Sequence, residues 1–264
     1  YDSNLYDIID NNDSSFKQIV HEENNFSNNT FNMHQIIKSI PNHDIKLGFS
    51  IVKLNSKFLT HRFLEDIMSD SITSSQTGYK RSVYLEDRWN ISKKLYLKLG
   101  FRDVFFSETG KKYFSPRASL SFNIYPYIRL QTSLSTLNKF THQYNNSLST
   151  RGTNKTWIIS DDIIPVSSSD NRHASIYLNK EYYELSFSYY FRKSKDIYDF
   201  NNIISPIPII NKEIEIIKKG SEKTYGSEFF FRVKNRKYNG WISYQYNSTQ
   251  FSFNHIDEGN FFQA

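Results

Sequence analysis

An all-β fold is what this sequence predicts, with antiparallel strands running up and down through a transmembrane barrel. Three observations lead to it. Apolar and polar residues alternate along many segments, these segments are each about ten residues long, and the connections between them are alternately short and long. Strands of globular proteins are mostly about five or six residues long, whereas a strand that crosses a bilayer needs about ten.

The first two strand pairs lie between residues 30 and 102. Residues 30–40 and 45–51 form one pair, and residues 82–91 and 95–102 form the next, each joined by a short polar turn. Alternation with a period of two over consecutive runs is typical of β-hairpins. Asp87 interrupts the apolar face of the second pair, and we expect it at the membrane interface or against an aromatic neighbour. One or two less regular strands precede residue 25.

Three further pairs follow with the same alternation. They lie at 117–124 with 128–135, at 174–178 with 185–191, and at 228–234 with 242–247. The pattern therefore predicts about ten to twelve strands in an up-and-down order. Residues 1–264 are expected to form one partial barrel domain, in which 1–28 are weakly assigned.

The connections distinguish a barrel from a soluble β-sandwich. Short turns are predicted at 41–43, 92–94, 125–126, 179–181 and 235–237, and long loops at about 55–78, 139–171 and 194–224. Outer-membrane barrels have short periplasmic turns and long extracellular loops, which produces this alternation. A soluble sandwich would place long connections without this regularity.

Composition excludes several other classes of protein. The sequence contains no run of 18 apolar residues, so no transmembrane helix is predicted. The absence of cysteine rules out disulfides and thiolate metal sites. The net charge of +6 is spread along the chain, and no RNP-like motif or basic helix accompanies it, so no nucleic-acid partner is expected. No catalytic motif, cofactor-binding motif or clustered histidine pair is found. We therefore expect neither an enzyme nor a cofactor.

Four stretches resemble TonB-dependent outer-membrane receptors in the form common among Bacteroidota. They are YLEDRWNISKKLYLKLGFR (84–102), YFSPRASLSFNI (113–124), PVSSSDNRHASIYLNKE (165–181) and KTYGSEFFFRVKNRKYNGWISYQYNSTQ (223–250), and NHDIKLGFS (42–50) matches an earlier strand. The resemblance implies a barrel of about 22 strands around an N-terminal plug, of which this chain would supply the middle part. The plug and the TonB-binding segment are not found in the sequence, which stops at NFFQA.

The same resemblance implies a location and partners. The complete protein would lie in the outer membrane of a Gram-negative, Bacteroidota-like bacterium and contact its lipid. It would bind a scarce metal chelate, vitamin, glycan or peptide outside the cell, and import it with energy from the TonB complex. A passive or adhesive outer-membrane barrel, or a soluble β-rich binding module, is the alternative.

Candidate site residues fall into two groups. The loop candidates for ligand contact are Trp157, Asp161, Asp162 and Arg172; the two aspartates would contact a cation or ligand, or form a solvated acidic turn. The polar positions of the strands would face the lumen: Glu86, Arg88, Lys98, Arg102, Arg117, Arg129, Glu184, Arg192, Glu228 and Arg232. These charges would line a wet lumen with cross-strand ion pairs, or a subset would dock a plug or guide a ligand.

Overall fold

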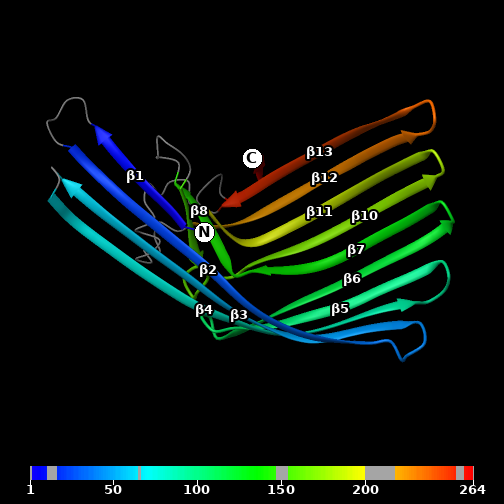
Figure 1. Ribbon diagram of the computed structural model, residues 1–264, viewed down its shortest axis with the longest axis horizontal. Helices are drawn as coiled ribbons and strands as arrows, with labels where there is room; N and C mark the ends of the chain where they lie inside the picture. Colours follow the sequence, from blue (N-terminus) through cyan, green and yellow to red (C-terminus); the bar gives the residue numbers. More distant parts are fainter. Residues whose placement is uncertain are drawn as a thin grey trace.

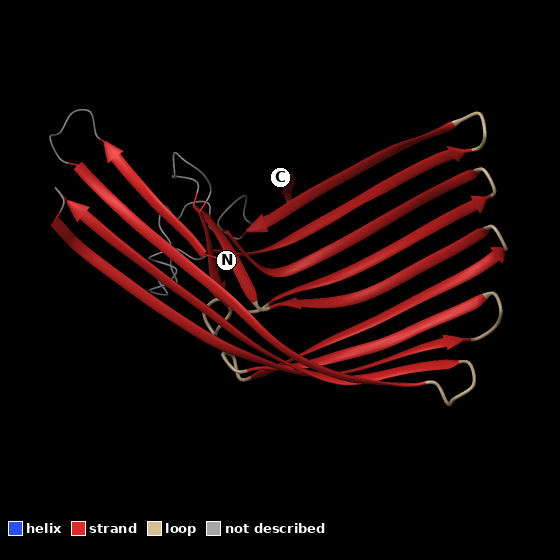
Figure 2. Ribbon diagram, viewed as in Figure 1, coloured by secondary structure: helices blue, strands red, loops and turns tan. Residues whose placement is uncertain are grey.

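The computed structural model describes residues 2–10, 17–64, 67–146, 154–199, 218–253 and 259–263, almost all of them in strands (Figures 1 and 2). The strands are β1 (Asp2–Asp10), β2 (Lys17–Ile37), β3 (His43–Leu64), β4 (Ile67–Asn90), β5 (Leu95–Phe106), β6 (Lys111–Tyr125), β7 (Ile128–Lys139), β8 (Thr141–Asn146), β9 (Asn154–Ile159), β10 (Ser167–Lys180), β11 (Tyr183–Asp199), β12 (Lys218–Lys234), β13 (Asn239–Phe253) and β14 (Phe262–Gln263). Within these residues no helix is long and apolar enough to cross a membrane.

Twelve of the strands form one curved antiparallel sheet in the order β1-β2-β3-β4-β5-β6-β7-β10-β11-β12-β13-β14. Every neighbour except β7 and β10 is consecutive in the chain, which is the up-and-down topology that the alternation predicted. The sheet does not close, so the described part of the chain forms a barrel wall with β1 and β14 at its edges (Figure 1). β8 and β9 form a separate two-stranded hairpin inserted between β7 and β10.

The five short turns lie together at one end of the sheet, which we call the turn end (Figure 2). Local backbone chemistry explains two of them. Asn42 adopts φ of 64° between β2 and β3, a left-handed conformation that asparagine tolerates better than most residues. Between β12 and β13 the side-chain oxygen of Asn235 accepts hydrogen bonds from the backbone N–H groups of Lys237 and Tyr238, which reverses the chain within a few residues.

The register divides the sheet into two faces. Residues directly opposite in an antiparallel pair project from the same face. One register row across six strands contains Glu86, Gly100, Arg117, Ser135, Asn171 and Arg192. We call the face that carries this row the inner face, because the β8–β9 hairpin packs against it, and the opposite face the outer face.

The long strands correct the predicted loop at 55–78. β3 and β4 contain 22 and 24 residues and remain paired through Phe58 and Ser74, far into that range. The reason is an inversion of the pattern. Toward the turn end the apolar residues lie on the outer face, but beyond Ile51 the inner face becomes apolar at Leu54 and Phe58 and the outer face becomes polar at Asn55.

The other two predicted loops are also shorter than expected. Strand β10 begins at Ser167, and β8 and β9 lie inside the range 139–171. In the range 194–224, β11 continues to Asp199 and β12 begins at Lys218, while residues 200–217 lie outside the described residues. Strand pairing therefore extends well past the ends that the hydropathy pattern indicated.

Candidate functional site

The inner face contains all ten charged residues that were predicted to point into a lumen. Their register places them on six strands, and none of the ten projects from the outer face. Seven are basic and three are acidic, so the surface that they form is positively charged. This charge favours anionic groups over cationic ones at the inner face.

Cross-strand ion pairs connect part of this set. Glu86 lies 3.0 Å from Lys98 and 3.9 Å from Arg117, and Glu184 lies 2.6 Å from Arg232. These side chains are all partly exposed, so each pair stabilises the sheet by about 1 kcal/mol or less. The network orders the carboxylates and leaves a surplus of cations.

Two of the remaining cations have aromatic or amide partners. The Arg102 guanidinium lies 5.1 Å from the centre of the Tyr84 ring, and the Arg129 Nε donates a hydrogen bond to Asn123 Oδ1. Near the turn end, Arg88, Lys98 and Arg129 line a cavity of about 410 Å³ together with serine and glutamine side chains. Tyr96 and Leu97 complete the lining, and none of the lining residues is acidic, which suits an anionic occupant.

The far end of the inner face holds the β8–β9 hairpin. Trp157 in β9 stacks on Phe26 of β2 with 5.0 Å between ring centres. Its backbone N–H donates to Asn24 Oδ1, and its carbonyl accepts from the Ser56 hydroxyl. The backbone N–H of Ile159 donates to Gln76 Oε1. Polar side chains of β2, β3 and β4 thus satisfy the free edge of β9, which fixes the hairpin on the sheet.

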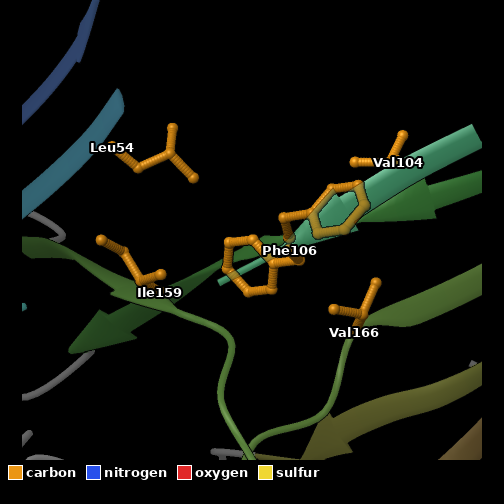
Figure 3. Packing of buried hydrophobic residues seen from close by; sticks show 6 residues of the cluster. Leu54, Val104, Phe106, Ile159 and Val166 are labelled. Atoms are coloured by element: carbon orange, nitrogen blue, oxygen red, sulfur yellow. The ribbon is translucent and has the colours of Figure 1, made fainter. Parts of the chain in front are cut away.

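An apolar cluster seals this contact. It contains Leu54, Val104, Phe106, Phe140, Ile159 and Val166, all less than 8 % exposed (Figure 3). Phe106 is fully buried and its ring meets that of Phe140 edge to face at 5.0 Å. The described parts of this segment, 140–146 and 154–166, are therefore packed on the inner face rather than free. Adjacent isoleucines at 158–159 and 163–164 were the signal in the sequence that could have indicated this core.

The four loop candidates have different environments. Trp157 is a half-buried residue of the hairpin, stacked on Phe26, and Asp162 is exposed. Asp161 is buried and its Oδ1 accepts hydrogen bonds from the backbone N–H groups of Ile163 and Ile164, so this carboxylate shapes the turn. Arg172 is not in a loop: it lies in β10 on the outer face, opposite Leu134 and Phe191. The prediction for Arg172 is corrected because β10 begins five residues before it, at Ser167.

Asp87, the interruption in the apolar outer face, has a partner. Its Oδ2 lies 2.7 Å from His43 Nδ1, and the His43 ring stacks on Trp89 at 5.3 Å. Asp87 lies near the turn end of β4, which ends at Asn90. The carboxylate is thus held beside an aromatic pair at the edge of the apolar surface, as expected.

Among the described residues no group of three His, Asp or Glu side chains could hold a metal ion. The described part of the inner face therefore offers a docked hairpin and a basic polar surface. Such a surface can bind and orient a ligand by charge and hydrogen bonding.

Similar architectures occur among solved structures. The ferric yersiniabactin uptake receptor FyuA from Yersinia pestis superimposes with a TM-score of 0.60 and 13% identity, over 98% of this chain and 40% of FyuA. The RagAB peptide transporter superimposes with a TM-score of 0.57 and 12% identity, over 90% of this chain and 31% of the transporter chain. The outer membrane transporter YddB from Escherichia coli superimposes with a TM-score of 0.52 and 14% identity, over 89% of this chain and 34% of YddB.

The chain spans less than half the length of each of these proteins. No family model matches the sequence, and no curated protein matches it. The likeness at this identity concerns the fold, and it confirms the fold that the resemblance to TonB-dependent receptors implied. The chain has the architecture of part of the barrel wall of outer-membrane receptors and transporters.

Replacing Phe106 by alanine is expected to release the hairpin while the sheet stays folded. Truncating a fully buried phenylalanine costs about 3–5 kcal/mol, and Phe106 contacts the hairpin core rather than the outer face. Limited proteolysis should then cut within 140–166 many times faster than in the unmodified protein. Phe105→Ala is the matched control, because Phe105 projects from the outer face; equal cleavage of both variants would contradict the assignment.

Acidification is expected to loosen the same hairpin. His142 in β8 is buried, its Nε2 lies 3.1 Å from Ser160 Oγ and 3.2 Å from the Pro165 carbonyl oxygen, and its ring meets that of Tyr198 edge to face. Burial, assisted by the charge of Lys139, lowers the pKa of His142 to about 4 from 6.5. The undocked state binds the proton more readily, so docking is fully stable above pH 6.5 and weakens as the pH falls toward 4, by up to about 3 kcal/mol.

Hydrogen exchange of the backbone of residues 141–146 and 157–166, measured at pH 7 and pH 5 and corrected for intrinsic rates, checks this prediction. His142→Gln should abolish the difference between the two pH values. A protection pattern that is identical at both pH values in the unmodified protein would show that His142 does not control docking.

Proposed function

We propose that this chain is part of the transmembrane barrel of a TonB-dependent receptor, a non-enzymatic transporter in the outer membrane of a Gram-negative, Bacteroidota-like bacterium. The complete protein would bind a scarce ligand outside the cell and import it with energy from the TonB complex. The observation that carries the proposal is the division of one sheet into an apolar outer face and a charged inner face with a docked hairpin.

The outer face argues for contact with lipid. Many large apolar side chains on it are exposed, with Val83 at 56 % and Leu134 at 54 % among the highest values. Apolar surface of this extent on a soluble protein would drive aggregation. In a bilayer the same side chains match the hydrocarbon, so the outer-membrane barrel is favoured over the alternative of a soluble β-rich module.

The inner face argues for a receptor rather than a plain barrel. Its far end is occupied by the hairpin, and its cations outnumber its carboxylates. An anionic ligand, such as a metal chelate with free carboxylates or an acidic peptide, fits this surface better than a cationic one. We propose that Asp162 and the edge of Trp157 lie where an incoming ligand first reaches the hairpin, while the cations beyond it attract the anion.

A passive or adhesive barrel is the competing function. A passive barrel conducts ions continuously, so the complete product of the gene that encodes this chain would give a steady conductance in a planar bilayer. A receptor would instead support uptake of a particular nutrient that stops when the proton gradient is collapsed. Growth of a strain without the gene on single metal chelates, vitamins, glycans or peptides identifies the nutrient, and persistence of uptake after adding a protonophore would exclude TonB-powered import.

The two faces can be tested for lipid contact with matched charges. Leu99→Arg places a cation on the outer face near the middle of the apolar surface, where it should cost about 2–4 kcal/mol. Ser133→Arg adds the same charge to the inner face, where its direct neighbours are Ser119 and His173 rather than a lysine or arginine, and should be tolerated. Heat-modifiable, folded protein in the outer-membrane fraction is the measurement, and equal yields of both variants would contradict the assignment of the faces.

A further inference from the structure

A row of cations borders the apolar part of the outer face on the side away from the turns. On six strands the first charged outer-face residue beyond the apolar stretch is lysine or arginine, whereas on β2 it is Glu23 and on β5 it is Asp103. We call these six residues the cationic row: Lys53 (β3), Arg81 (β4), Lys112 (β6), Arg172 (β10), Lys193 (β11) and Lys223 (β12).

The position of this row matches the edge of a bilayer. The stretch of β4 from Trp89 to Arg81 rises about 26 Å along the strand, and a tilt near 40° reduces this to about 20 Å along the membrane normal. The apolar band of outer-membrane barrels is about 25 Å tall. If the outer face contacts lipid, as the proposed function requires, the cationic row lies at the headgroups of the outer leaflet.

Within the described part of the protein the cationic row forms no ion pair, although the carboxylates of Asp103 and Asp170 lie on the same face. No carboxylate there lies within 4 Å of any of its six charged groups. Lys193 and Lys223 are directly opposite each other in register, an arrangement that is unfavourable unless an anion neutralises it. Asp170 lies opposite Lys193 on the other side, but its Oδ1 accepts a hydrogen bond from the Thr136 hydroxyl. The remaining contacts of the row are aromatic: Lys53 lies over Tyr79, Arg172 over Phe191 and Lys223 over Phe261.

A groove on the outer face leads up to this row. The ladder between β6 and β7 ends at the pair Arg117–Ser135, and the next residue of β6 is Pro116, which has no N–H to donate. The Asn138 side chain bridges the separated strands by donating to Ser115 Oγ at 2.9 Å. On the outer side the separation leaves a cavity of about 630 Å³. Its lining is mostly apolar, with Phe101, Phe114, Pro116 and Leu134 among others, and its charged residues are Asp87, Arg117, Asp170 and Arg172.

We propose that this groove and the cationic row bind a phosphorylated lipid of the outer leaflet. An acyl chain lies in the groove against Phe101, Phe114 and Leu134, and the phosphate is neutralised by Arg172 with help from its neighbours in the row. Arginine suits this role because its planar guanidinium binds phosphate oxygens in pairs. Arg172 can reach both parts of such a ligand, since it lines the groove and lies at the height of the row. The ligand class follows from charge complementarity combined with an apolar cleft of ligand size.

The test uses the complete, folded gene product purified from outer membranes in a mild detergent. Native mass spectrometry measures binding of added lipid A with two phosphates, of its dephosphorylated form, and of inorganic phosphate. The test variant is Arg81→Gln with Arg172→Gln. The control is Lys94→Gln with Lys237→Gln, which removes the same charge from turn residues at the opposite end of the strands.

We expect the doubly phosphorylated lipid to remain bound to the unmodified protein and to the control. Its affinity should fall about fivefold for each cation removed from the row. The dephosphorylated lipid and inorganic phosphate should each bind much more weakly, because each satisfies only one part of the site. Equal lipid binding by the test and control variants would overturn the proposal, as would equal binding of the dephosphorylated lipid or occupation of this face by a second copy of the protein.

Failure of this inference can be told apart from failure of the proposed function. The outer-membrane fraction and heat-modifiability of the same preparation report whether the sheet inserts at all. A protein that inserts but shows no preference for phosphorylated lipid contradicts only the lipid site. A protein that remains in the soluble fraction contradicts the proposed function as well.

Discussion

Everything in this architecture depends on the two-residue period of a paired antiparallel strand. Each strand of the large sheet inside its two edges is hydrogen-bonded on both sides, so its side chains must alternate strictly between two faces. A slip of one residue in any pair would send the charges of Glu86 or Arg117 to the outer face and leucines to the inner one. The irregularities that occur, such as the one between Asn123 and Tyr125, are confined to single residues near strand ends. Register thus fixes both the lipid-compatible surface and the charged one.

Much of this fold could be predicted because alternation records the register directly. Residues 82–102 predicted a hairpin with the correct turn and the correct sides for Glu86, Lys98 and Arg102. The same reading failed at 55–78 because it assumed that apolar residues always lie on the outer face. Beyond Ile51 the phase of the pattern reverses, with Leu54 and Phe58 on the inner face. A strand whose polarity inverts halfway has no continuous apolar side, and it was therefore interpreted as a loop.

The hairpin was beyond prediction for a different reason. Its core joins Leu54, Phe106 and Ile159, which are far apart in the sequence and come from three different hairpins of the chain. Alternation describes neighbours across one ladder and carries no information on which distant segment covers a face. Asp161 illustrates the consequence. Its local sequence is equally compatible with an exposed acidic pair in a loop and with the observed buried carboxylate, which accepts hydrogen bonds from two backbone N–H groups. Only the packing of the inserted segment separates them.

The reversal of phase also explains why the cationic row has its position. On the turn side of the reversal the outer face is apolar and the inner face is hydrated, so each strand can contact hydrocarbon. Beyond the reversal the outer face is polar and the inner face supplies the core under the hairpin, at Leu54 on β3 and Phe106 on β5. Lys53 and Arg81 mark the change on two adjacent strands. Lys53 directly precedes the inner-face Leu54, and Arg81 lies opposite Phe105 in the ladder between β4 and β5. The height of the apolar outer surface is therefore coupled to the position of the inner core, and shifting it along the strands would require changing the outer cations and the inner core together.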